Sequence, residues 1–251
     1  MSEIKIYWIV IIFYMFIVIG IGLIASRRTR GISDFYLGGR NIGPFVTALS
    51  FIAAYFSSVV IIGGGGFGYK FGMSTLWVGA INVLLGCTLC WIFLGKRLRK
   101  YTQKFGTMTI PGFISERFKA PETRFFLAIV IFIFMIIYNV SVLKGMGHIF
   151  EVLMKIPYIY GILISGTIII LYVTIGGYVA VVWTSFIQAL IMIVGLFLLT
   201  SKSLIAVGGL TAVNERLAAI DPGLLSTPGV WGYAGLISYC LIVSFGVWGM
   251  P

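Results

Sequence analysis

The residues of this chain that could do chemistry are few and widely spaced. Among 251 residues there is one histidine, His148, and there are three cysteines, Cys87, Cys90 and Cys240. Cys87 and Cys90 form a CxxC pair inside an apolar stretch, and no second pair completes a zinc site. Patterns typical of zinc proteases, serine hydrolases or phosphate-binding loops do not occur in the sequence. The sequence therefore predicts that the protein is not an enzyme and that His148 is an interfacial residue without a special role.

One apolar stretch, PFVTALSFIAAYFSSVVIIGGGGFGY at 44–69, contains residues that interrupt helices. A glycine inside a helix costs about 1 kcal/mol relative to alanine, and serine hydroxyls can replace backbone partners where a membrane helix breaks. Transporters use such broken helices to bind Na⁺ through freed carbonyl oxygens near the bilayer midplane. Small residues also let membrane helices pack closely without any binding role. This stretch alone leaves both interpretations open.

A second stretch, GGYVAVVWTSFIQ at 176–188, favours the binding interpretation. Gly176 and Gly177 predict a very short turn, and Thr184, Ser185 and Gln188 enter the helix that follows. Polar groups inside a membrane helix are functional candidates because burying them in lipid is costly.

The elements that must position these residues are membrane helices. The chain is 60% hydrophobic and only 10% charged, and its charges lie in short clusters between long apolar runs. Runs of about 20 apolar residues span a bilayer, and without apolar/polar alternation they fit helices and not barrel strands. The predicted fold class is all-α integral membrane, a single transmembrane domain with about seven helices. The predicted spans are 7–25, 44–66, 74–95, 125–143, 158–175, 178–200 and 232–251.

Basic residues predict the orientation of these spans. Four lie between the first two spans and eight between the third and fourth, whereas the tail and the alternate loops carry one or two each. The positive-inside rule then places the N-terminus outside a plasma membrane. The same rule explains the net charge of +11, so nucleic acid is not an expected partner and the lipid bilayer is.

Two loops are long enough to hold short helices. Thr109 is the predicted N-cap of a helix at the membrane surface that begins near Pro111, and Thr211 is the predicted N-cap of a helix that ends at Pro222. The last span stops at Pro251 without a polar flank, so the sequence is expected to be truncated at its C-terminus.

The stretches FYLGGRNIGPFVTALS at 35–50 and GGYVAVVWTSFIQ at 176–188 resemble motifs of the sodium:solute symporter family, whose members transport proline, pantothenate, sugars and short carboxylates. The resemblance covers essentially the whole chain. It implies a LeuT-like fold of two inverted five-helix repeats preceded by an extra N-terminal helix. The chain would hold that extra helix, the first repeat and the start of the second.

The resemblance also implies a set of site residues. Backbone carbonyls of Ala53 and Phe56 would bind Na⁺, the expected coupling ion. The residues that would contact the solute are Ser57, Ser58, Tyr138, Asn139, Ser141 and Trp248.

Two departures from the family pattern concern the solute and the coupling ratio. Tyr55 stands where proline-type members carry an aspartate, and Val243 and Val247 stand where they carry aromatic residues, which weakens a proline assignment. Ser185 replaces the aspartate of the usual WTD sequence, so one Na⁺ per solute is expected. The predicted function is sodium-coupled symport of pantothenate, an amino acid such as proline, or a similar small carboxylate. The alternative is a truncated or non-transporting membrane protein or sensor of the same fold.

Overall fold

The computed structural model describes residues 3–27, 31–57 and 59–248, and over these residues its regular elements are helices. They form two compact units. Unit 1 contains Met1–Ile62 and Ala128–Leu196, and unit 2 contains Gly63–Leu127 and Phe197–Pro251.

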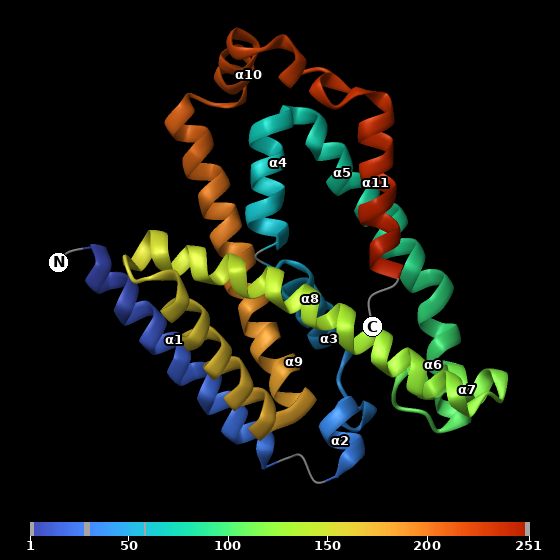
Figure 1. Cartoon of the computed structure of the whole chain (residues 1–251). Helices are drawn as coiled ribbons and strands as arrows, with labels where there is room; N and C mark the ends of the chain where they lie inside the picture. The colour runs from blue at the N-terminus through green and yellow to red at the C-terminus, as the bar shows by residue number, and fades with distance from the viewer. Residues whose placement is uncertain (1–2, 28–30, 58, 249–251) are drawn as a thin grey trace. The chain divides into compact units, whose positions relative to one another are not determined.

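Unit 1 consists of long apolar helices with two short ones between them (Figure 1). In chain order these are α1 (Glu3–Ser26), α2 (Ile32–Leu37), α3 (Pro44–Tyr55), most of α8 (Pro121–Met154) and most of α9 (Tyr158–Val207). Large apolar side chains on these helices are widely exposed, for example Phe132 at 67%. Such exposure suits lipid-facing helices, whose backbone groups are bonded internally and whose side chains need no aqueous solvent.

Glycines set the close approach of α1 to the first limb of α9, and these two segments lie side by side in Figure 1. A Cβ placed on Gly22 would contact Tyr172 Cβ at 3.4 Å, and one on Gly176 would lie 2.9 Å from Gly22 O. Small residues let membrane helices approach to backbone contact, where dispersion forces are strongest.

The turn predicted at Gly176–Gly177 is present. Gly177 has φ 58° and ψ −154°, a conformation essentially restricted to glycine, and α9 reverses direction there. The spans predicted at 158–175 and 178–200 correspond to its two limbs.

Unit 2 is built on a helical hairpin that α11 packs against. In chain order it contains α4 (Gly64–Phe71), a 3₁₀ turn (Gly72–Ser74), α5 (Thr75–Ile81), π-helical turns (Asn82–Thr88 and Trp91–Gly95), α6 (Lys96–Phe105), α7 (Ile110–Phe118), the start of α8, the end of α9, α10 (Leu210–Ile220), two further 3₁₀ turns (Pro222–Leu224 and Gly229–Trp231) and α11 (Gly232–Trp248). The chain turns back between α4 and α5 and then runs continuously into α6 (Figure 1).

The core of unit 2 lies between α5 and α11. Val78 packs with Leu236 and Cys240, and Cys240 is only 2% exposed. Beside this core Trp231 stacks on Phe71 at 3.8 Å between ring centroids. Aromatic pairs of this kind add about 0.5–1.5 kcal/mol beyond the area that they bury.

At Gly86 the π-helical turn Asn82–Thr88 passes close to the backbone of α11. A Cβ on Gly86 would overlap Asn82 Oδ1 and lie 3.0 Å from Ser244 O. Replacing Gly86 by alanine should therefore push the helices apart and lower the free energy of unfolding by about 1–3 kcal/mol, the usual effect of overpacking. Gly79→Ala is the control, because a Cβ there meets nothing within 4 Å. Denaturant unfolding in detergent measures both variants, and equal stability would disprove this close packing.

Five helices are long and apolar enough to cross a membrane, and the shorter apolar helix Pro44–Tyr55 adds to them. The five are Lys5–Ser26, Val60–Phe105, Pro121–Met154, Tyr158–Val207 and Gly229–Trp248. Val60–Phe105 and Tyr158–Val207 each turn back once, so each holds two limbs. Seven as the number of spans stays a prediction.

One predicted cap is confirmed and the other is wrong. Thr109 caps α7, since its hydroxyl accepts a hydrogen bond from Gly112 N at 3.2 Å. The N-cap of α10 is Gly209 and not Thr211. Gly209 has φ 93°, and its N–H donates to Leu204 O at 2.8 Å, which closes α9. The next helix begins directly at Leu210, so Thr211 lies in its first turn.

Candidate functional site

The predicted interruption of the second apolar segment is present between α3 and the helical turns that follow. α3 begins with Pro44 at its first position, where the missing N–H of proline costs no hydrogen bond. The helix ends at Tyr55, and a π-helical turn covers Val59–Gly63 before α4 begins. The segment is apolar on both sides of the break, so the interruption lies inside a stretch with the composition of a membrane span.

The backbone at the break forms a γ-turn. Phe56 N–H donates to Ile52 O at 2.9 Å, which is the last regular helical bond. Phe56 itself has φ −77° and ψ 63°, the geometry of an inverse γ-turn, and Ser57 N–H consequently donates to Tyr55 O at 2.8 Å. In a continuous helix Ser57 N–H would donate to Ala53 O.

This geometry frees main-chain oxygens. Among the described residues no backbone N–H donates to the carbonyl oxygens of Ala53 and Phe56. Ser57 O, in contrast, accepts from the N–H groups of Val60 and Ile61, each at 3.0 Å. The chain therefore re-enters a helix directly after Ser57, and the freed oxygens are confined to the short segment before it.

The hydroxyl of Ser57 lies in the same segment. Its side chain is half-buried and makes no hydrogen bond to a described residue. Carbonyl and hydroxyl oxygens are the ligands that hard cations prefer, and an unbonded carbonyl in lipid costs several kcal/mol unless something binds it. The chemistry available at the break is the binding of a small cation. Ser58, the other predicted serine, lies outside the described residues.

Three predicted site residues lie on α8, in the same unit. Asn139 Nδ2 donates to Met135 O at 2.8 Å, and Ser141 Oγ donates to Ile137 O at 3.5 Å. Both side chains are exposed, and Tyr138 is half-buried. In the described part of the chain no hydrogen bond or ring contact joins these three residues to the break. Their contact with solute stays a prediction.

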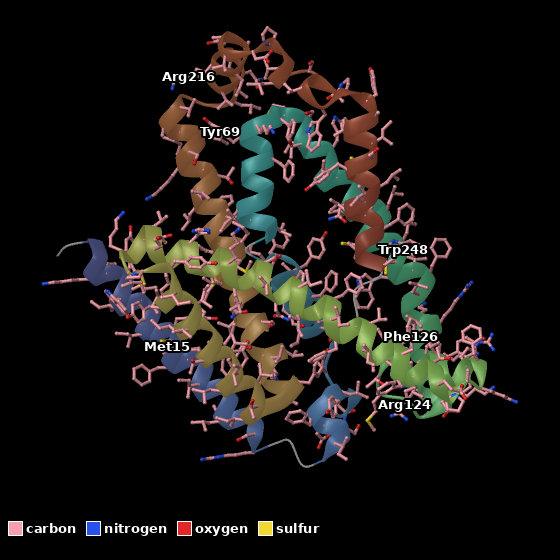
Figure 2. All side chains as sticks on the ribbon, viewed as in Figure 1. Met15, Tyr69, Arg124, Phe126, Arg216 and Trp248 are labelled. Atoms are coloured by element: carbon pink, nitrogen blue, oxygen red, sulfur yellow. The ribbon has the colours of Figure 1, made fainter. Side chains whose placement is uncertain are left out.

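Trp248 belongs to unit 2, at the end of α11 that Figure 2 labels. Its indole Nε1 donates to Leu85 O at 2.9 Å, and its ring lies near those of Phe93 and Phe245, with centroids 6.4 and 6.0 Å away. Leu85 lies in the π-helical turn Asn82–Thr88, where the wider helix displaces carbonyls from their usual partners. The structure therefore ties the end of α11 to this turn, and the contact of Trp248 with solute stays a prediction.

Of the polar residues after Gly177, Thr184 and Ser185 are buried and Gln188 is half-buried. Thr184 is 1% exposed, and its hydroxyl donates to Ala180 O at 2.9 Å. Ser185 is also buried. The amide of Gln188 donates to the hydroxyl of Tyr14 on α1, so a polar bond links the first helix to the second limb of α9. Sequence reasoning missed Tyr14, because one tyrosine in a uniformly apolar segment carries no pattern.

His148, the one histidine of the chain, contacts a carboxylate of its own helix and a neighbouring ring. His148 Nδ1 lies 3.3 Å from Glu151 Oε2 on the same helix, and its ring packs at 4.9 Å from that of Tyr158. No group of three or more His, Cys, Asp or Glu side chains that could hold a metal ion occurs among the described residues.

Comparison with known proteins identifies one family and several relatives whose names agree with it. Residues 35–251 match the sequence profile of the sodium:solute symporter family. The "High-affinity proline transporter PutP" of Bacillus subtilis is 34% identical over 234 residues, which are 92% of this chain and 49% of that protein. The "Osmoregulated proline transporter OpuE" of the same organism is 34% identical over 240 residues, 94% of this chain and 47% of that protein.

A third relative is the "Sodium/proline symporter" of Escherichia coli, 37% identical over 199 residues, 78% of this chain and 39% of that protein. The chain thus spans about half the length of the curated relatives that it matches. No solved structure matches it.

Proposed function

The chain belongs to the sodium:solute symporter family, and we propose that the protein couples the entry of Na⁺ to the uptake of a small organic solute across the plasma membrane by alternating access. In this proposal Na⁺ binds at the break between α3 and α4, and the solute binds next to it. Ion binding favours one conformation and raises the affinity for solute, and by linkage the solute raises the affinity for Na⁺ by the same factor.

A single observation carries this proposal. Ser57 N–H bonds to Tyr55 O at 2.8 Å instead of to Ala53 O, which leaves the carbonyls of Ala53 and Phe56 without a described backbone donor inside an apolar segment. Freed carbonyls at a broken helix are the usual Na⁺ ligands of this class of transporter. A chain that merely needed to span the bilayer would gain stability by closing this gap, so the gap supports a binding role.

For the solute we propose a small amino acid or carboxylate, with proline as the first candidate. The relatives named above are proline transporters by name. Tyr55, Val243 and Val247 depart from the proline-type pattern. Pantothenate and other short carboxylates are therefore further candidates for the solute. Ser57 and Ser58 would face the solute from the break, with Tyr138, Asn139 and Ser141 of the same unit beside them.

Uptake into proteoliposomes tests the proposal. The full-length protein should accumulate labelled proline, pantothenate or a short carboxylate when Na⁺ is high outside, and replacing Na⁺ by K⁺ should abolish accumulation. Binding of a solute without any accumulation would favour the non-transporting alternative. Uptake that is equal in Na⁺ and K⁺ would overturn sodium coupling.

The coupling ratio should be one Na⁺ per solute. Ser185 stands where a carboxylate would offer a second cation site, and it is a buried neutral side chain in a helix. Parallel fluxes of ²²Na⁺ and labelled solute give the ratio directly. A ratio of two would show that a second cation binds without this carboxylate.

A further inference from the structure

The hairpin of α6 and α7 in unit 2, together with the first residues of α8, carries a strong excess of positive charge. Eight basic side chains occur between Lys96 and Arg124, with only Glu116 and Glu122 as acidic neighbours. The eight are Lys96, Arg97, Arg99, Lys100, Lys104, Arg117, Lys119 and Arg124, and each is exposed. None of them forms an ion pair with a described residue, and the ion pair found among the described residues joins His148 to Glu151. Within the part of the chain that the structure describes, no ion pair neutralises this charge.

Four of the five basic residues of α6 are gathered on one face. Lys96, Lys100 and Lys104 are spaced four residues apart, and Arg97 is three residues before Lys100, so the four project from neighbouring positions of the helix. We call Lys96, Arg97, Lys100 and Lys104 the basic face. Like charges at this spacing repel one another, which destabilises the helix unless anions lie between them.

An adjoining face of α6, which carries Tyr101 and Phe105, holds the helix against α7. Tyr101 and Phe105 stack with ring centroids 6.2 Å apart, and Phe105 lies 6.1 Å from Phe113 of α7. The guanidinium of Arg117 lies over the ring of Tyr101 at 6.0 Å. A glycine at φ 66°, Gly106, allows the tight turn between the two helices. The hairpin is thus fixed by its own rings, and the basic face is not needed for that packing.

The hairpin is placed at a membrane surface by the chain itself. α6 directly continues the second limb of the candidate membrane span Val60–Phe105 and forms its polar end. Its ten residues extend about 15 Å at 1.5 Å per residue, which is more than enough to cross the headgroup region of one leaflet, about 5–8 Å deep. Phe125 and Phe126 follow Arg124 and are 73% and 65% exposed, and Figure 2 labels Arg124 and Phe126 in this region. Exposed aromatic residues beside basic ones are typical of helices at the bilayer interface.

We propose that the basic face of α6, with Arg117 and Lys119 of the adjoining turn, binds the phosphate headgroups of anionic phospholipids in the leaflet where α6 ends. Clusters of four to eight Lys and Arg next to a membrane helix attract anionic lipid, and each adds about a fivefold factor in affinity. The positive-inside rule explains why the charges lie on one side of the membrane. It does not require that four of them share one helical face without acidic partners.

Lipid titration of the purified chain tests the proposal. Short-chain phosphatidylglycerol is added to the detergent-solubilised 251-residue protein, and the bound lipid is counted by native mass spectrometry, with phosphatidylcholine as the neutral lipid. Phosphatidylglycerol should bind at least tenfold more tightly than phosphatidylcholine, and binding should weaken as salt rises. Inorganic phosphate at equal concentration should compete poorly, because it lacks the acyl chains that contact Phe125 and Phe126.

Two quadruple variants locate the effect. K96Q/R97Q/K100Q/K104Q removes the basic face and should weaken phosphatidylglycerol binding at least tenfold, whereas K144Q/K155Q/K202Q/R216Q removes four exposed charges elsewhere and should change it less than threefold. K96R/K100R/K104R should keep wild-type binding. If the first variant fails to purify, K100Q and K104Q each give the same test at about fivefold.

Four outcomes would overturn the proposal. These are equal binding of the two lipids, equal losses in the two quadruple variants, phosphate competing as strongly as phosphatidylglycerol, and tighter binding of a short oligonucleotide than of lipid. The experiment measures lipid binding alone, so its result does not depend on whether the protein transports a solute.

Discussion

Replacing Ser57 by alanine should lower Na⁺-driven solute uptake by about five- to thirtyfold in the full-length protein. The hydroxyl of Ser57 is half-buried, has no described hydrogen-bond partner and lies at the γ-turn that frees the carbonyls of Ala53 and Phe56. Losing one such hydroxyl from a ligand costs about 1–2 kcal/mol. Because the backbone of the break does not depend on the side chain of Ser57, the loss should come from binding and not from folding.

Ser50→Ala is the matched control for this prediction. Ser50 lies on α3, the helix that precedes the break, and its hydroxyl already donates to Thr47 O at 3.0 Å. Its removal should leave uptake within about twofold of the unmodified protein, since serine bonded to its own helix contributes little. Initial uptake rates are measured against solute concentration at fixed Na⁺ and are normalised to protein in the membrane. Equal uptake by Ser57→Ala and Ser50→Ala would remove Ser57 from the site.

Replacing Gly177 by alanine should largely prevent accumulation of folded protein. Gly177 has φ 58° and ψ −154°, a conformation that residues with a Cβ adopt only under strain of about 1–3 kcal/mol. A Cβ there would also lie 2.7 Å from Phe35 Cδ2 and 3.0 Å from Phe35 O, and the backbone oxygen cannot move aside cheaply. Strain and overpacking together exceed about 3 kcal/mol, which is a large part of the stability of most domains.

Gly195→Ala tests whether this effect belongs to the turn. Gly195 lies in the second limb of the same helix, and a Cβ there meets nothing within 4 Å. Alanine favours a helix by about 1 kcal/mol over glycine, so this variant should be as stable as the unmodified protein or slightly more stable. Size-exclusion profiles and melting temperatures of the two variants provide the measurement. Normal yield and melting of Gly177→Ala would show that the chain does not need glycine at this turn.

The sequence predicted the helices and the two places where they break, because both depend on local chemistry. Apolar runs of membrane length, a glycine pair at 176–177 and serines beside a glycine run at 63–66 are all visible without tertiary information. The N-cap at Thr109 followed from the same local rules. The wrong prediction of Thr211 as N-cap also has a local cause. Gly208 and Gly209 both precede α10 with positive φ, and the helix is capped at Gly209.

The partners of the candidate site could not be predicted in the same way. The bond from Gln188 to Tyr14 joins positions 174 residues apart, and the bond from Trp248 to Leu85 depends on a π-helical turn that no residue pattern marks. Asn139 and Ser141 donate hydrogen bonds to carbonyls of their own helix. A polar residue in a sequence pattern does not show whether its side chain bonds to its own helix or contacts a solute. Family resemblance supplied Asn139, Ser141 and Trp248 as site residues, and their contact with solute stays a prediction.

Carbonyl resonances measured by solid-state NMR test the central claim most directly. The full-length protein is labelled with ¹³C at the carbonyl of phenylalanine and with ¹⁵N at serine, which selects Phe–Ser pairs such as Phe56–Ser57, and the signal is assigned by its loss in Phe56→Leu. Replacing K⁺ by Na⁺ in lipid vesicles should shift the Phe56 carbonyl, with a midpoint at the Na⁺ concentration that half-activates uptake. A carbonyl signal that stays unchanged at Na⁺ concentrations that support full uptake would show that Na⁺ does not bind at this break.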